Sequence, residues 1–191
     1  MSVIFLTEQL NSIENTKREN RERVANIVLD DNRLVKHLIS ITFDVTNKSS
    51  TKAAWILEWL CTHHQIELIL PYLDEFTSKI KTLQFDSAIR PCAKICEQLA
   101  IAYCNKNNND IKKQLQQNHI ELIIETGFDW LLTPQKIAVR AYTMNTLYLF
   151  GLQKDWIHKE LKNIIETKII HESKGTKARG KHILKLIEKC S

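Results

Sequence analysis

The stretch KAAWILEWLCTHHQIELI, from Lys52 to Ile69, contains two tryptophans, two histidines and a cysteine. Its apolar residues recur at three- and four-residue spacing, which is the period of an amphipathic helix. Within it, AWILEWL at Ala54 shares the pattern A-x-I-x-E-x-L with AKICEQL at Ala93, 39 residues further on. The stretch is therefore predicted to be part of a repeated helical unit.

Looser copies of the same motif occur elsewhere in the chain. AYTMNTL begins at Ala141, GKHILKL begins at Gly180, and a partial copy, ANI, begins at Ala25. A basic residue shortly precedes the small residue of each copy: Arg23, Lys52, Arg90, Arg140 and Arg179. A repeat of about 40 residues is typical of arrays built from antiparallel helix pairs.

Glycine and proline are rare, at four and three residues, which argues against a protein of strands and turns. The periodicity predicts ten helices, with proline kinks at Pro71 and Pro91. Thr133 is predicted to be an N-cap, followed by Pro134 in the first helical position. The predicted helices cover residues 3–14, 17–29, 33–45, 51–63, 66–83, 87–105, 111–132, 135–151, 155–170 and 174–189.

These features predict an all-α fold in which residues 1–191 form a single domain. The repeat length and the helix pairs resemble the HEAT family of α-solenoids. That resemblance implies a right-handed superhelix of about five antiparallel pairs, whose second helices line a concave groove. Each pair buries its apolar stripe only by stacking on its neighbours.

The chain also resembles a group of short helical-repeat proteins of Bacteroidetes. The resemblance lies in KAAWILEWLC, FDSAIRPCAKICEQLA, FDWLL, VRAYTMNTLYLFG and TKARGKHILK. Members of that group are often labelled adenylosuccinate lyase, a class with a serine-rich loop followed by Met-Pro and Lys-x-Asn. The nearest counterpart here is Ser49-Ser50-Thr51-Lys52. The Met, Pro and Asn of the loop motif do not follow it. The resemblance thus implies a HEAT-like fold and carries over no catalytic residue.

The charge of +5 is concentrated at one end of the chain. From Lys168 onward, seven Lys and Arg residues accompany only two glutamates. Such an end is typical of a solvated terminal helix, and the alternatives are contact with nucleic acid, an anionic membrane surface or an acidic partner. The short apolar runs and the first ten residues, MSVIFLTEQL, predict neither a membrane span nor a secretion signal. We expect a cytoplasmic protein with reduced thiols.

The cysteines and histidines have two interpretations. Cys92 and Cys96 are one helical turn apart, with Cys61, His63 and His64 one repeat earlier, and zinc prefers four such ligands. No C-x-x-C or paired H-x3-H spacing accompanies them, and small thiols suit close helix packing. We therefore expect core cysteines, no metal and no cofactor. Neither a glycine-rich phosphate loop nor a nucleophile–base pair is visible.

Two tryptophans on one helical face leave a further choice open. Trp55 and Trp59, with Glu58 and Glu97, match the kind of residues that stack on a nucleotide and stabilise a cationic sugar in HEAT-like alkylpurine DNA glycosylases. Base stacking contributes about 1–3 kcal/mol per base. Tryptophans in amphipathic helices also pack between neighbouring units.

The charged residues of the second helices are predicted to form the binding groove: Lys52, Glu58, Arg90, Lys94, Glu97, Arg140 and Arg179. Arg90, Lys94 and Glu97 share a helical face and are expected to be accessible, whereas Ile95 and Leu99 are expected to be buried. Such residues serve either as structural pairs or as a recognition surface. The leading hypothesis is a non-enzymatic scaffold that binds a protein or peptide. The alternative is nucleic-acid binding through the row of basic residues.

Overall fold

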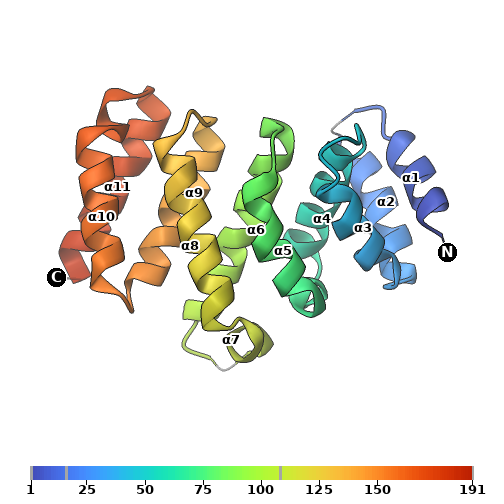
Figure 1. Ribbon diagram of the computed structural model, residues 1–191, viewed down its shortest axis with the longest axis horizontal. Coiled ribbons are helices and arrows are strands. Elements are labelled where there is room, and N and C mark those ends of the chain that lie inside the picture. Colours follow the sequence, from blue (N-terminus) through green and yellow to red (C-terminus); the bar gives the residue numbers. More distant parts are fainter. Residues whose placement is uncertain (1, 16, 108, 191) are drawn as a thin grey trace. The chain divides into compact units, whose positions relative to one another are not determined.

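The computed structural model describes residues 2–15, 17–107 and 109–190, and no strand occurs among them. The prediction of an all-α fold is thereby confirmed. The α-helices are shown in Figure 1. In chain order, the helical elements are α1 (Val3–Asn11), α2 (Arg18–Asp30), α3 (Leu34–Thr42), α4 (Ser50–His63), η1 (Ile66–Tyr72), α5 (Leu73–Lys79), η2 (Ile80–Thr82), α6 (Asp86–Cys104), α7 (Asp110–Gln114), α8 (Gln117–Leu132), α9 (Ile137–Gly151), α10 (Asp155–Thr167), η3 (Ile169–His171) and α11 (Lys174–Cys190).

The contacts between residues divide the chain into two compact units, one ending at Ile95 and the next beginning at Cys96. The division falls within α6. The expectation of a single helical-repeat domain stays a prediction.

Helix α4 is the centre of the first unit. It packs against α1, α2, α3 and η1, and Ala54, Ile56 and Leu57 on it have no exposed surface. The aromatic core of this unit includes Phe43 and Phe76, whose rings meet edge to face at 5.8 Å. The apolar period of the opening stretch thus buries one helix among several neighbours. Burial of apolar surface is the dominant favourable term in folding.

Helix α9 has the corresponding position in the second unit, where it packs against α8, α10 and α11. The small residue of the repeated motif marks close helix packing. A Cβ atom on Gly180 of α11 would lie 3.0 Å from the side chains of Ile165 and Ile169. Ala25 and Ala54 are likewise fully buried.

The predicted helix over 111–132 is instead two helices, α7 and α8. Leu115 and Gln116 have extended backbones between them, with ψ of 92° and 166°. The backbone N–H of Gln116 donates to Nδ1 of His119 at 3.1 Å, and that bond caps the start of α8. A histidine three residues into the helix is an unusual capping residue, and the apolar period alone did not predict the break.

The proline predictions have mixed outcomes. Pro71 lies in the 3-10 helix η1, so the predicted helix over 66–83 is a 3-10 helix, an α-helix and a second 3-10 turn. Helix α6 continues through Pro91. The prediction that Thr133 is an N-cap is wrong: Thr133 ends α8, its N–H and its hydroxyl both bond to the carbonyl of Asp129, and α9 begins at Ile137.

Candidate functional site

Glu58 and Arg90 form a bidentate ion pair between α4 and α6. Nη1 of Arg90 lies 3.1 Å from Oε1 of Glu58, and Nη2 lies 2.6 Å from Oε2. The Arg90 side chain keeps 33% of its surface exposed and that of Glu58 keeps 12%. Of the two roles left open for these charged residues, Glu58 and Arg90 thus form a structural pair. Because both groups are partly desolvated, the pair is stronger than an open surface pair.

Glu97 departs from its predicted place. It is 5% exposed, and Nδ2 of Asn145 on α9 donates to its Oε1 at 2.9 Å. The expectation that Glu97 is accessible is therefore wrong, because a neighbouring helix covers it. Lys94 is half-buried. Ile95 and Leu99 have no exposed surface, as expected.

The basic residues that precede the motif copies, here called the basic row, are Arg23, Lys52, Arg90, Arg140 and Arg179. Three of them contact the ends of other helices. Arg140 is 7% exposed and donates to the carbonyls of Leu131 at 2.8 Å and Thr133 at 2.9 Å, at the end of α8. It also forms an ion pair with Glu172 at 3.0 Å. Nζ of Lys52 donates to the carbonyl of Asn11, the last residue of α1, at 3.1 Å.

Arg23 contacts the same end of α1. Its guanidinium donates to the side chains of Gln9 at 2.8 Å and Ser12 at 2.6 Å. Cations near a helix C-terminus are favoured by the helix dipole and by unpaired carbonyls. The repeated basic residue therefore has a structural role in these copies. Arg179 is half-exposed on α11.

Trp55 is half-buried and bonds to the backbone of α6. Its Nε1 donates to the carbonyl of Ser87 at 3.1 Å. Residue 91, four positions after Ser87, is a proline without an N–H, so this carbonyl has lost its usual helical donor. The indole of Trp55 replaces the missing donor.

Trp59 is 4% exposed and lies in a group of polar side chains. Its Nε1 donates to Oε2 of Glu22 on α2, and its ring stacks on His63 at 3.8 Å with an interplanar angle of 13°. The guanidiniums of Arg21 and Arg18 lie 4.5 Å and 5.4 Å from the ring centroid. The sequence allowed two positions for the Trp59 side chain, in the core or in the groove. With 4% of its surface exposed, it lies in the core.

We call this group the arginine–tryptophan cluster: Arg18, Arg21, Glu22, Trp59, His63 and His64. His64 contributes Nε2, which lies 3.4 Å from Oε1 of Glu22. The α2 members were missed from the sequence. Their spacing of three and four residues places them on one face of α2, but nothing local shows that this face meets Trp59.

Arg18 and Arg21 differ from Arg23, Arg33, Arg90 and Arg140 in what their guanidiniums contact. Neither has a hydrogen bond or an ion pair to another residue in the described part of the chain, and Nε of Arg21 is shielded from water without a partner. Arg23, Arg33, Arg90 and Arg140, by contrast, all have hydrogen-bond acceptors. The two guanidiniums of the cluster thus have donors without an acceptor among the described residues.

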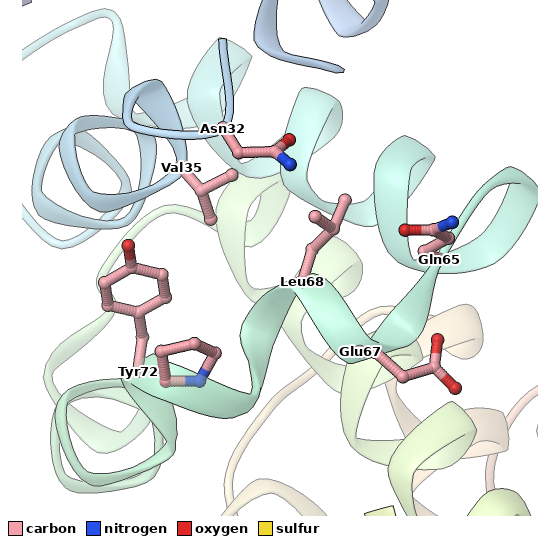
Figure 2. Close-up of a pocket in the computed structure, with 7 residues that line it drawn as sticks. Asn32, Val35, Gln65, Glu67, Leu68 and Tyr72 are labelled. Atoms are coloured by element: carbon pink, nitrogen blue, oxygen red, sulfur yellow. The ribbon is translucent and has the colours of Figure 1, made fainter. Parts of the chain in front are cut away.

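A pocket of about 290 Å³ lies beside the cluster, in the same unit. Figure 2 shows its lining residues, among them Val35, Leu68 and Tyr72, the amides of Asn32 and Gln65, and the carboxylate of Glu67. A second recess, lined by Leu29, Asn32, His64 and Gln65, shares two of these residues and reaches the cluster through His64. Apolar walls with a few polar groups at the rim are typical of binding pockets.

The thiols lie mainly in the interior. Cys61, Cys92 and Cys96 are at most 5% exposed, and burial raises the pKa of Cys61 and of Cys96 to about 12. Their predicted burial is confirmed. Across residues 2–15, 17–107 and 109–190, no three His, Cys, Asp or Glu residues come together as a possible metal site. In the same ranges, no helix combines the length and apolar composition of a membrane span.

Comparisons with protein-family models, with curated proteins and with solved structures found no match.

Proposed function

We propose that this chain is a non-enzymatic helical-repeat scaffold of the HEAT type that binds a segment of a partner protein. Within each unit, helices contact the helix after the next one: α1 with α3, α2 with α4, α8 with α10, and α9 with α11. Consecutive helices also pack together at α3 with α4, α8 with α9, and α9 with α10. Stacked helix pairs make such contacts, and arrays of this kind present long surfaces to partners. The 39-residue spacing of the motif supports the same proposal.

The pocket of Figure 2 is the observation that carries the binding role. At about 290 Å³ it is small for a ligand of drug size and suits a single inserted side chain. Leu68, Pro71 and Tyr72 offer apolar surface to that side chain. The amides of Asn32 and Gln65 have donors and acceptors that match a peptide backbone.

The basic row supports a protein partner over nucleic acid. Contacts to phosphates require free cationic side chains. Arg23, Lys52, Arg90 and Arg140 instead have acceptors inside the fold. Trp59, with 4% of its surface exposed, offers little area to a base.

Photo-crosslinking tests the pocket directly. A benzophenone amino acid replaces Gln65, which is exposed at the rim, and in a matched control it replaces Ser40, which is exposed on α3. In cells that express the chain, we expect a discrete protein adduct from position 65 and none from position 40. The absence of an adduct at 65, or one that nuclease removes, would contradict a protein partner.

The non-enzymatic part has its own test. The purified chain is assayed for cleavage of adenylosuccinate, the activity named for the group that the sequence resembles. We expect no turnover above the buffer rate. Turnover that a single substitution abolishes would overturn this part of the proposal.

A further inference from the structure

We propose that Arg18 and Arg21 bind carboxylate side chains of an acidic segment in the partner protein. The inference rests on the proposed function and adds the chemistry of the partner. Its basis is the pair of guanidiniums that converge on Trp59, at 4.5 Å and 5.4 Å from one ring centroid, with no acceptor among the described residues.

The charge balance of the cluster favours an external anion. Two cations held above one ring repel each other, and an anion between them removes that cost. Glu22, the acid within the cluster, already accepts from Nε1 of Trp59 and pairs with His64. Its single negative charge does not balance the two guanidiniums, and neither of these contacts is to an arginine.

The position on α2 adds to the positive potential. Arg18 is the first residue of the helix, Arg21 lies one turn later, and Lys17 occupies the N-cap without a side-chain hydrogen bond. A helix N-terminus is the positive end of the dipole, where cations are disfavoured and anions are stabilised. A bound carboxylate would interact with the helix end and the guanidiniums together.

Contact with the Trp59 ring preorganises the two guanidiniums for binding an anion. A guanidinium over an indole ring gains cation–π attraction and loses rotational freedom before any ligand arrives. The fork of N–H donors then matches a carboxylate in a bidentate arrangement.

The test measures binding of a fluorescein-labelled hexaglutamate peptide by fluorescence anisotropy at low salt. We expect the Arg18→Gln, Arg21→Gln double variant to bind at least roughly tenfold more weakly, because two charge-assisted interactions are lost. Arg18→Gln alone, at an exposed position, should give an intermediate loss. Circular dichroism confirms that each variant is folded.

The matched control is Arg33→Gln, in which the lost arginine is exposed and already paired with Asp31 at 2.7 Å. It should bind hexaglutamate as the native chain does, and hexalysine should not bind. Equal hexaglutamate binding by the native chain and the double variant would overturn the inference, as would no binding at all. So would a single-stranded oligonucleotide that binds through these arginines when hexaglutamate does not.

The two proposals fail in different ways. If the adduct from position 65 forms but the double variant still binds hexaglutamate normally, the acidic-segment inference is wrong and the scaffold stands. If no adduct forms but hexaglutamate binding depends on Arg18 and Arg21, the cluster is an anion site and the pocket proposal is wrong.

Discussion

Arg140 and Arg179 each immediately precede the small residue of a motif copy, yet their surroundings differ. Arg140 is buried and bonds to two carbonyls at the end of α8 and to Glu172. Arg179 is half-exposed. The arginine at this motif position therefore holds the end of a helix in the copy at Arg140. No such contact is seen for Arg179 among the described residues.

Replacement of Arg140 by alanine should lower the free energy of unfolding by about 3 kcal/mol, because buried acceptors and the Glu172 carboxylate lose their donor. Arg140→Lys keeps the charge but lacks the planar fork, so its loss should be intermediate. Arg179→Ala is the matched control and should change stability by less than about 0.5 kcal/mol. Urea unfolding measures all three, and equal losses at 140 and 179 would contradict the structural role.

The buried thiols predict a dependence of stability on pH. Burial raises the pKa of Cys61 and of Cys96 from 9.0 to about 12, so the folded state keeps both neutral where the unfolded chain ionises them. Their contribution is complete below pH 9 and decreases as the pH rises toward 12. Between pH 8 and pH 10 the native chain should lose about 1.4 kcal/mol per thiol.

The control for this effect is the Cys61→Ala, Cys96→Ala variant, measured by urea unfolding at both pH values. Its decrease in unfolding free energy between pH 8 and pH 10 should be smaller than that of the native chain. A decrease of the same size would show that other groups cause the alkaline loss.

At the scale of elements, α6 shows how a proline is accommodated inside a helix. Pro91 has no N–H for the carbonyl of Ser87, and Nε1 of Trp55 on α4 donates to it instead. The hydrogen bond within one helix is exchanged for a bond between two helices. An unpaired, partly buried carbonyl would otherwise reduce stability.

This exchange predicts a coupling between two substitutions. Trp55→Phe should cost about 1 kcal/mol from the lost hydrogen bond, in addition to any packing change. In a Pro91→Ala background, the restored N–H of residue 91 can bond to Ser87, so Trp55→Phe should cost less. A double-mutant cycle by urea unfolding measures the difference, and equal costs in both backgrounds would refute the replacement.

At the scale of the whole molecule, each unit has one helix surrounded by several others. Helix α4 packs against α1, α2, α3 and η1, and α9 packs against α8, α10 and α11. Helix α1 is less completely buried than α4. Its apolar residues Val3 and Ile4 are exposed, with 72% of the surface of Ile4 accessible. Local stability follows the number of such packed neighbours.

Native-state hydrogen exchange should therefore be slowest in α4 and α9. Amides of α1 and of the five-residue helix α7 should exchange faster, because fewer buried contacts hold them. Mass spectrometry of deuterated peptides reports each segment. Exchange in α1 or α7 as slow as in α4 would contradict this order.

The sequence alone determined the all-helical class and most helix positions. The apolar period is a local property, and each residue of a helix meets its neighbours three and four positions away. It predicted α2, α4, α9 and α11 within two residues of their bounds, and Asp155 as the start of α10. Burial of Ile95 and Leu99 followed from the same period.

Only the tertiary structure decided what the polar side chains bind. Glu58 meets Arg90 from 32 positions away, Glu97 meets Asn145 from 48, and Trp59 meets Glu22 from 37. Which faces meet at such separations depends on how helices cross and stack, and no local pattern contains that information. The same packing brings Arg18 and Arg21 to Trp59 and buries Glu97, because the position of a charge on its own helix does not specify its neighbours.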